Sequence, residues 1–288
     1  MTDFISKHRL HFNFKAFVSA ALNEDVGDGD HTSLSTIPAS KQGKMKLLVK
    51  EAGIIAGVEA AKQICKLTDS RLKFVQLIAD GQSVKPGDIV FTLQGKVQTL
   101  LKLERLLLNI MQRMSGIATK TAYLQASCKG THCKVIDTRK TTPGFRFFEK
   151  WAVVIGGGAN HRYGLYDMIL IKDNHVDFAG GITKAIDAAN SYLKTKKKKL
   201  RIEIETRSIN DVKQVLKHGG VHRIMLDNYS VADTKAAVKL IAGKFEVESS
   251  GGITEKTIAN YAKCGVDFIS VGALTHHVKS LDLSLKAV

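Results

Sequence analysis

The chain has 288 residues, of which 44% are hydrophobic, and its formal net charge at pH 7 is +16. This length and apolar content suffice for one large or two modest domains and argue against a disordered protein. Its apolar runs fall short of the roughly 18 residues of a membrane span. The N-terminal MTDFISKHRLHFNF lacks the apolar core of a signal peptide, so we expect a cytoplasmic protein without a membrane partner.

The positive charge has two interpretations. A nucleic-acid-binding protein would carry basic residues interleaved with aromatic ones on one face, or a recognisable module. Here the lysines are scattered, and one dense run, Lys196 to Lys199, joins a predicted helix to a predicted strand. We therefore favour a solvated basic surface that attracts anionic substrates, and expect no nucleic-acid partner.

The four cysteines show no CxxC pair and no zinc-ligand spacing. Reduced, scattered thiols are favoured over the alternative that Cys128 and Cys133 form half of a metal site.

Residues 1–114 read as a small α+β domain. A helix is predicted near 14–23, followed by the turn-rich segment EDVGDGDHTS at 24–33. Strands are predicted at 44–50, 72–78 and 89–94, with a helix near 57–67 between the first two. A long helical pattern over 99–127 then links the two parts of the chain, and we expect it to break near Ser115-Gly116.

From Lys134 onward, strands alternate with single helices. Strands are predicted at 134–137, 168–171, 201–206, 223–227, 245–249 and 267–272, and helices at 182–194, 209–219, 231–243 and 254–265. Gly219, Gly243 and Gly265 stand where helices commonly end. The alternation indicates parallel βαβ units. Such units form a barrel or a doubly wound sheet, and we favour an α/β barrel, which need not be complete, because polar residues recur where the strands end.

Basic side chains occur in three loops of this region. Arg139 and Lys140 follow the strand at 134–137, His161 and Arg162 follow the Gly156-Gly157-Gly158 loop, and Lys172 follows the strand at 168–171. Such side chains, taken singly, are most often surface ion pairs. Five of them around one glycine-rich loop indicate a pocket for a polyanionic small molecule.

An acidic group lies on the next two strands. Glu203 and Glu205 share one face of their strand, because side chains alternate along it, and Asp227 ends the strand that follows. Glu205 and Asp227 are candidates to hold Mg²⁺ or ribose hydroxyls. The alternative, that these acids neutralise neighbouring lysines, is left open.

Glycine loops follow the last two strands. They are Ser249-Ser250-Gly251-Gly252 and Val271-Gly272-Ala273, and their backbone N–H groups are suited to binding a phosphate. The alternative is a pair of tight turns that need glycine. Arg105 stands apart within the leucine-rich LERLLLN, where spacing alone favours a solvent-facing side chain.

Eight ordered blocks together resemble the quinolinate phosphoribosyltransferases (nicotinate-nucleotide pyrophosphorylases, carboxylating). The blocks are EDVGDGD, LERLLLNIMQRMSGIAT, DTRKTTPG, GGGANHR, LIKDNH, MLDN, SSGGI and SVGALTH, spread over nearly the whole chain. The resemblance implies an N-terminal α/β sandwich domain at 1–114 and an open, seven-stranded α/β barrel of the type II phosphoribosyltransferase kind at 115–275. A tail at 276–288 would pack back on the first domain. Because six strands are predicted, one is missing, at 145–160 or before Lys134.

The resemblance also implies a role for each site residue. Arg139, His161 and Arg162 would grip the two carboxylates of quinolinate, together with Arg105 from the neighbouring subunit of a dimer. The catalytic residues would be Lys140, Lys172, Glu205 and Asp227. The two lysines would line the border between quinolinate and the phosphoribosyl group, and Thr138 would also bind substrate. Glu205 and Asp227 would lie near the ribose hydroxyls and Mg²⁺. Ser250, Gly251, Gly252, Val271, Gly272 and Ala273 would cradle the 5′-phosphate.

The implied reaction is a pentosyl transfer. Quinolinate and phosphoribosyl pyrophosphate would give nicotinate mononucleotide, pyrophosphate and CO₂, a step of de novo NAD synthesis. A relative of the same fold that uses nicotinate is the alternative among enzymes, and a two-carboxylate clamp argues against it. A basic nucleic-acid-binding or scaffold protein is the alternative of another class.

Overall fold

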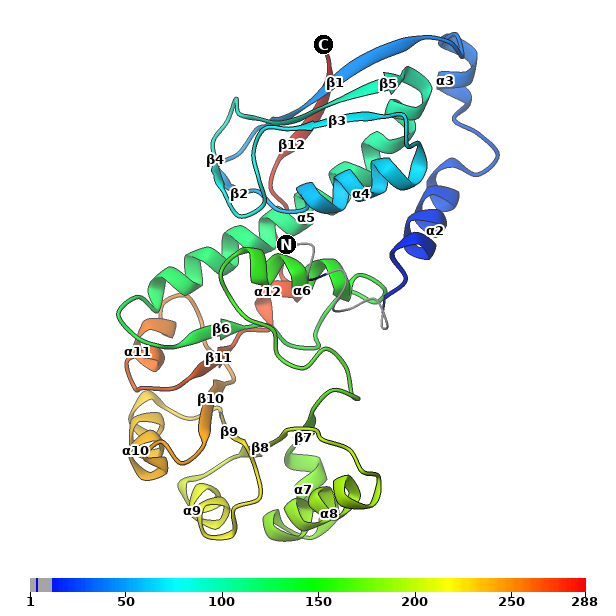
Figure 1. Cartoon of the computed structure of the whole chain (residues 1–288). Helices are drawn as coiled ribbons and strands as arrows, with labels where there is room; N and C mark the ends of the chain where they lie inside the picture. Colours follow the sequence, from blue (N-terminus) through cyan, green and yellow to red (C-terminus); the bar gives the residue numbers. More distant parts are fainter. Residues whose placement is uncertain (1–3, 5–11) are drawn as a thin grey trace. The chain divides into compact units, whose positions relative to one another are not determined.

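The computed structural model describes Phe4 and residues 12–288 (Figure 1). The chain forms two compact units. The first comprises Met1–Ala122, Thr141–Gly157 and His277–Val288, and the second comprises Tyr123–Lys140 and Gly158–His276. Helix α5 (Val97–Ser127) runs from the first unit into the second. None of the helices in the described ranges is long and apolar enough to cross a membrane.

An antiparallel sheet is the centre of the first unit. Its strands lie in the order β12 (Leu283–Ala287), β1 (Gln42–Val49), β5 (Ile89–Lys96) and β3 (Lys73–Gln76). Two short strands, β2 (Gly53–Ile54) and β4 (Ser83–Val84), pair beside it. The predicted strands at 44–50, 72–78 and 89–94 are confirmed, whereas β2, β4 and β12 were not anticipated. β2 and β4 have two residues each, too few for a periodic pattern, and β12 is recognised through its pairing with β1.

Helix α4 (Val58–Thr68) accompanies this sheet (Figure 1) and confirms the helix predicted near 57–67. Its apolar face is buried, and the buried carboxylate of Asp80 accepts the N–H groups of Val58 and Glu59 at 2.8 and 3.2 Å. An acid at this place satisfies the N–H groups that the first turn of a helix leaves without intrahelical partners.

The N-terminal segment is more helical than predicted. Helix α2 (Phe14–Val26) extends beyond the expected 14–23, and α3 (His31–Thr36) occupies part of the segment predicted to be turns. The side chain of Asp30 accepts the N–H of Ser33 at 3.1 Å and so caps α3. A capping acid and a turn acid look alike in sequence, which explains the error.

Helix α5 is continuous over all 31 residues, so the break predicted near Ser115-Gly116 is wrong. Ser115 accepts the N–H of Ala56 at 2.9 Å, and the backbone at Lys279 and Ser280 fills the space where a Cβ on Gly116 would lie. The two small residues let other backbone segments approach the helix. They do not interrupt it.

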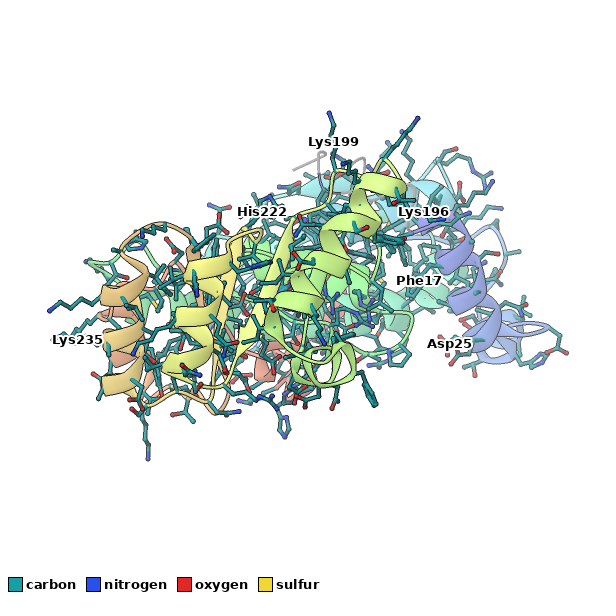
Figure 2. All side chains as sticks on the ribbon, turned by 90° about the horizontal axis from the view of Figure 1, so that it is seen from below. Phe17, Asp25, Lys196, Lys199, His222 and Lys235 are labelled. Carbon is teal, nitrogen blue, oxygen red and sulfur yellow. The ribbon has the colours of Figure 1, made fainter. Side chains whose placement is uncertain are left out.

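Helix α6 (Arg146–Ile155) was not predicted. Its segment lies within 145–160, one of the two places where a missing strand was expected. It buries Phe147, Phe148 and Trp151. The ring of Phe12 stacks on that of Phe147 with centroids 4.3 Å apart, and Phe17, labelled in Figure 2, approaches Phe148 at 4.9 Å. The aromatic residues of this stretch therefore build a cluster with the N-terminal segment.

The second unit is built on a parallel sheet. In the described residues it has six strands, in the order β6 (Lys134–Ile136), β11 (Phe268–Ser270), β10 (Glu246–Ser250), β9 (Arg223–Asp227), β8 (Ile202–Thr206) and β7 (Ile169–Ile171). All of its strand pairs are parallel, and β6 and β7 are the two edges. The predicted strands and the open α/β barrel are confirmed.

The resemblance implies a seventh strand, and the described residues contain a remnant of one. Ala159 forms an isolated parallel bridge with Ile136, on the edge of β6. A single bridged residue does not make a strand. The glycine loop 156–158 precedes it, and Asn160 and His161 follow it without strand pairing.

Helices cover the outer side of this sheet (Figure 1). They are α7 (Asp173–Ala179), α8 (Ile182–Thr195), α9 (Ile209–His218), α10 (Val231–Ile241) and α11 (Ile258–Ala262). The short α12 (Ala273–His276) lies instead beyond the end of β11 (Figure 1). The helix predicted at 254–265 is shorter than expected. Gly219 follows α9 as predicted, but Ala242, not Gly243, follows α10 in the left-handed conformation, and Lys263, not Gly265, follows α11.

Candidate active site

A cavity of about 790 Å³ opens in the second unit, where the strands end. All predicted site residues that belong to this unit line it: Thr138, Arg139, Lys140, His161, Arg162, Lys172, Glu205, Asp227, Ser250, Gly251, Gly252, Val271, Gly272 and Ala273. The structure therefore brings together groups that span 136 positions of the sequence, because the carboxyl ends of parallel strands meet at one edge of a sheet.

Asp137 joins two of the basic segments. Its side chain is fully buried at the end of β6, and Oδ1 accepts the backbone N–H of His161 at 3.0 Å. The Ile136–Ala159 bridge runs alongside. Arg139 and Lys140 are thereby held near His161 and Arg162, although 20 residues of the chain lie between the two pairs.

The basic side chains of the cavity repel one another. Burial lowers the pKa of Arg162, and the positive charge of Arg139 lowers it further. Two guanidinium groups held close in a partly buried site favour an anionic ligand that lies between them. The planar fork of a guanidinium matches the geometry of a carboxylate.

Lys172 and Glu205 link the basic and acidic sides of the cavity. Nζ of Lys172, at the start of α7, lies 3.3 Å from Oε2 of Glu205 on β8. Burial is the main cause that raises the pKa of Glu205; Lys172 opposes this rise and the charge of Asp227 adds to it. A cation beside Glu205 and Asp227 would offset the effect of Asp227 on Glu205, and carboxylate oxygens are the ligands that Mg²⁺ prefers. The donor set at Glu205 and Asp227 fits that metal.

The glycine loop after β10 has a conformation that other residues would strain. Gly251 and Gly252 have φ values of +88° and +60°, and a Cβ on Gly251 would collide with the side chain and backbone of Asn228. Glycine is needed here both for backbone conformation and for space. Gly251 and Gly252 line the cavity, and they have no side chain to cover their backbone there.

A buried ionic cluster lies at the floor of the cavity. It consists of His161, Glu203, Arg223 and Glu248, and both carboxylates are 0% exposed. Glu203 is in register with Arg223 on the neighbouring strand, so strand alternation places these side chains on the inner face with Glu205 and Asp227. Burial acts to lower the pKa of His161, and the carboxylates of Glu203 and Glu248 near Nε2 act to raise it. The backbone N–H of Arg162, which points at Nδ1 from 2.7 Å, opposes a second proton on the ring.

Sequence reasoning missed several lining residues. They are Leu170, Met225, Asn228, Glu248, Ile253, Ser270 and His276. The alternation in EVESS carried a usable signal for Glu248, because it shares its face with Ser250 as Glu203 does with Glu205. The other residues carry no chemical signature that distinguishes them from core or turn residues.

Arg105 belongs to the first unit, on α5, and its side chain is exposed. Lys196 to Lys199 are also exposed, beyond the end of α8, where Figure 2 labels the first and last of them. Neither position lines the cavity described above.

Two family models match the chain. The N-terminal domain of quinolinate phosphoribosyl transferase matches residues 30–115, and the C-terminal domain matches residues 117–286. The chain is 43% identical to quinolinate phosphoribosyltransferase [decarboxylating] 1b of Nicotiana tabacum over 99% of its own length and 85% of the relative's. It is 45% identical to the chloroplastic nicotinate-nucleotide pyrophosphorylase [carboxylating] of Arabidopsis thaliana, over 96% and 83%.

The fold is similar to that of solved structures. NadC from Streptococcus pyogenes superposes with a TM-score of 0.88 at 39% identity, over 94% of this chain and 95% of that one.

Proposed function

Because the chain belongs to the quinolinate phosphoribosyltransferase family, we propose that it transfers the phosphoribosyl group of phosphoribosyl pyrophosphate to quinolinate. Quinolinate loses its 2-carboxylate as CO₂, and the products are nicotinate mononucleotide and pyrophosphate, in a step of NAD biosynthesis. The observation that carries the proposal is the single cavity in which clustered guanidinium and ammonium groups face a carboxylate pair and two glycine loops.

The basic side of the cavity binds the pyridine diacid. Arg139 and Arg162 face the two carboxylates, with His161 in the wall beside them. Lys140 and Lys172 stand where the diacid meets the sugar phosphate. Clustered like charges of this kind lose their mutual repulsion when a dianion binds, which favours quinolinate over a monoacid such as nicotinate.

The acidic side and the glycine loops bind the phosphoribosyl group. Ser250, Gly251 and Gly252, with Val271, Gly272 and Ala273, offer backbone N–H groups to the 5′-phosphate. Glu205 and Asp227 contact the ribose hydroxyls and would hold Mg²⁺. When bound, the metal supplies positive charge for the departing pyrophosphate.

Catalysis by this arrangement consists of positioning and charge stabilisation. The arginines hold quinolinate so that its ring nitrogen faces C1 of the ribose. Negative charge at Glu205 and Asp227 favours the oxocarbenium character that develops as the C1–O bond to pyrophosphate breaks. The ring nitrogen then forms its bond to C1, and loss of CO₂ from C2 is followed by protonation of that carbon.

The proposal includes a homodimer in which Arg105 of one subunit completes the site of the other. Its exposed side chain on α5 supports this, because an arginine on a mostly apolar helix is available to a partner. A mixture of Arg105→Ala and Arg139→Ala proteins tests it. If Arg105 acts in trans, subunit exchange creates one intact site per mixed dimer and activity returns. If each protein stays inactive after verified exchange, Arg105 acts within its own subunit.

A cytoplasmic location is also part of the proposal. The four cysteines are free thiols, as expected in a reducing compartment. Relatives named chloroplastic and mitochondrial make fractionation of the source cells the appropriate test.

A turnover assay tests the function. Pyrophosphate release is measured with phosphoribosyl pyrophosphate, Mg²⁺ and either quinolinate or nicotinate. We expect turnover with quinolinate and a kcat/KM for nicotinate lower by about 100-fold or more. Arg139→Ala should remove most of the quinolinate turnover, and Lys263→Ala, an exposed change outside the cavity, serves as the control. Normal quinolinate turnover by Arg139→Ala would disprove the clamp.

A further inference from the structure

The ring of His161 has a protein partner at each nitrogen. Nε2 lies 3.0 Å from Oε2 of Glu203 and 3.3 Å from Oε2 of Glu248. Nδ1 accepts the backbone N–H of Arg162 at 2.7 Å. A backbone N–H is always a donor, so Nδ1 must present a lone pair, and the proton of the ring lies on Nε2 toward the carboxylates. The side chain of His161 is 6% exposed, and each of its ring nitrogens lies near a protein group.

Arg223 holds the same carboxylate oxygen of Glu248 that His161 approaches. Nη1 of Arg223 lies 3.0 Å from Oε2 of Glu248, and its Nε donates to Glu246 at 3.1 Å. The guanidinium carbon also lies 3.9 Å from the centre of the Phe268 ring on β11. Arg223 is therefore fixed by two neighbouring strands, and a rigid cation of this kind fixes the carboxylate that it binds.

We propose that Glu248 is a positioning residue for the carboxylate clamp. Held by Arg223, it fixes the ring of His161, and the ring holds the backbone of Arg162, whose guanidinium faces the substrate. His161 then serves the substrate through Arg162 and not through an N–H of its own. The proposal rests on the proposed role of Arg162 in binding quinolinate.

A metal site is the other chemistry that these side chains suggest, because ligand atoms of His161, Glu203 and Glu248 lie within 4.8 Å of one another. Arg223 argues against it. Its Nη1 lies 3.0 Å from Glu248 and 3.8 Å from Glu203, so a permanent positive charge already occupies the vicinity of both carboxylates. A second cation would be repelled, and the positioning role is favoured.

Steady-state kinetics of three variants test the proposal. Glu248→Ala should raise the KM for quinolinate by about tenfold or more and leave the KM for phosphoribosyl pyrophosphate within about twofold, because a displaced clamp affects one substrate. Glu248→Gln keeps an acceptor oxygen and should restore most of the loss. Lys263→Ala, an exposed change outside the cavity, is the control. An unchanged quinolinate KM in Glu248→Ala, or an equal rise of both KM values, would overturn the proposal.

The unaltered protein provides a test if Glu248→Ala does not fold. ¹⁵N spectra of histidine-labelled protein, with His161 assigned by comparison with His161→Asn, report which ring nitrogen carries a proton. We expect Nε2 protonated and Nδ1 unprotonated, both before and after quinolinate is added. A proton that appears on Nδ1 with quinolinate would show direct contact and refute the positioning role. Failure of the unaltered enzyme to turn over quinolinate would instead count against the proposed function.

Discussion

Nζ of Lys172 lies 3.3 Å from Oε2 of Glu205, so the last basic group of the cavity and its most buried metal-ligand candidate form an ion pair. Lys172 is half exposed and Glu205 is 7% exposed. The carboxylate therefore depends on this partner more than the lysine does, since a buried charge without a partner is costly. The pair ties the part of the site assigned to the diacid to the part assigned to the ribose.

Glu205→Gln should disable the phosphoribosyl side of the site. The amide keeps the size of the side chain but removes the charge that Mg²⁺ and the developing oxocarbenium require. We expect kcat/KM for phosphoribosyl pyrophosphate to fall by about 100-fold, or about 2.7 kcal/mol. Asp173→Asn, next to Lys172 on α7, is the control and should stay within about twofold. A normal KM and kcat in Glu205→Gln would refute the assignment.

Gly251→Ala should weaken binding of the 5′-phosphate. Its Cβ would collide with Asn228, and the residue has a φ of +88°. Gly243→Ala is the matched control, because Gly243 has a φ of +74° and a Cβ there meets nothing within 4 Å. Both variants should lose about 1 kcal/mol of stability from backbone strain. We expect Gly251→Ala alone to raise the KM for phosphoribosyl pyrophosphate; an equal effect of both variants would contradict a cradle.

Gly116→Ala should destabilise the protein although alanine favours helices. Replacement of glycine in the middle of a helix normally stabilises by about 1 kcal/mol. Here the added Cβ would overlap the carbonyl of Lys279, and backbone atoms yield little. We expect a loss of about 1–3 kcal/mol, as for an overpacked core. Chemical denaturation measures it, with the exposed Asn109→Ala of the same helix as the control. A stabilised Gly116→Ala protein would show that the two segments separate easily.

Alkaline pH should destabilise the protein partly through Cys65. Burial raises the pKa of this thiol to about 12. In the unfolded chain a thiol loses its proton near pH 8.5, so between these values the folded state retains a proton that the unfolded state has released. Stability from this group is complete below about pH 8.5 and falls by up to about 1.4 kcal/mol per pH unit above it.

Denaturation of Cys65→Ala and of the unaltered protein at pH 8 and pH 10.5, under reducing conditions, isolates this contribution. Other groups whose ionisation differs between the folded and unfolded states, such as Tyr229, are common to both proteins. The variant should lose less stability between the two pH values. Equal losses would mean that the Cys65 thiol ionises in the folded protein as readily as in the unfolded chain.

The barrel and most of its site could be predicted from the sequence because both depend on local patterns. Short apolar strands separated by single helices define parallel units, and in parallel units the strand ends converge. Arg139, Lys172, Glu205 and Asp227 each follow or end a strand, so their meeting in one cavity follows from the alternation.

The features that were missed depend on contacts between distant parts of the chain. Gly116 resembles a helix break until the backbone at Lys279 is placed against it. Strand β12 is recognisable as a strand through its pairing with β1. Glu248 becomes notable when strand register sets it between His161 and Arg223. Periodicity reports which face a residue occupies and does not report what that face meets.

The position of β12 has a consequence for how the protein is made. Strand β1 pairs on one side with β5, about 40 residues later, and on the other with residues 283–287. During synthesis the sheet of the first unit therefore keeps one edge unpaired until the whole second unit has left the ribosome. An unpaired edge can join a strand from another chain, so the nascent protein is exposed to misassembly for most of its synthesis. Truncations that remove β12 should therefore aggregate during expression, even though they retain every residue of the cavity.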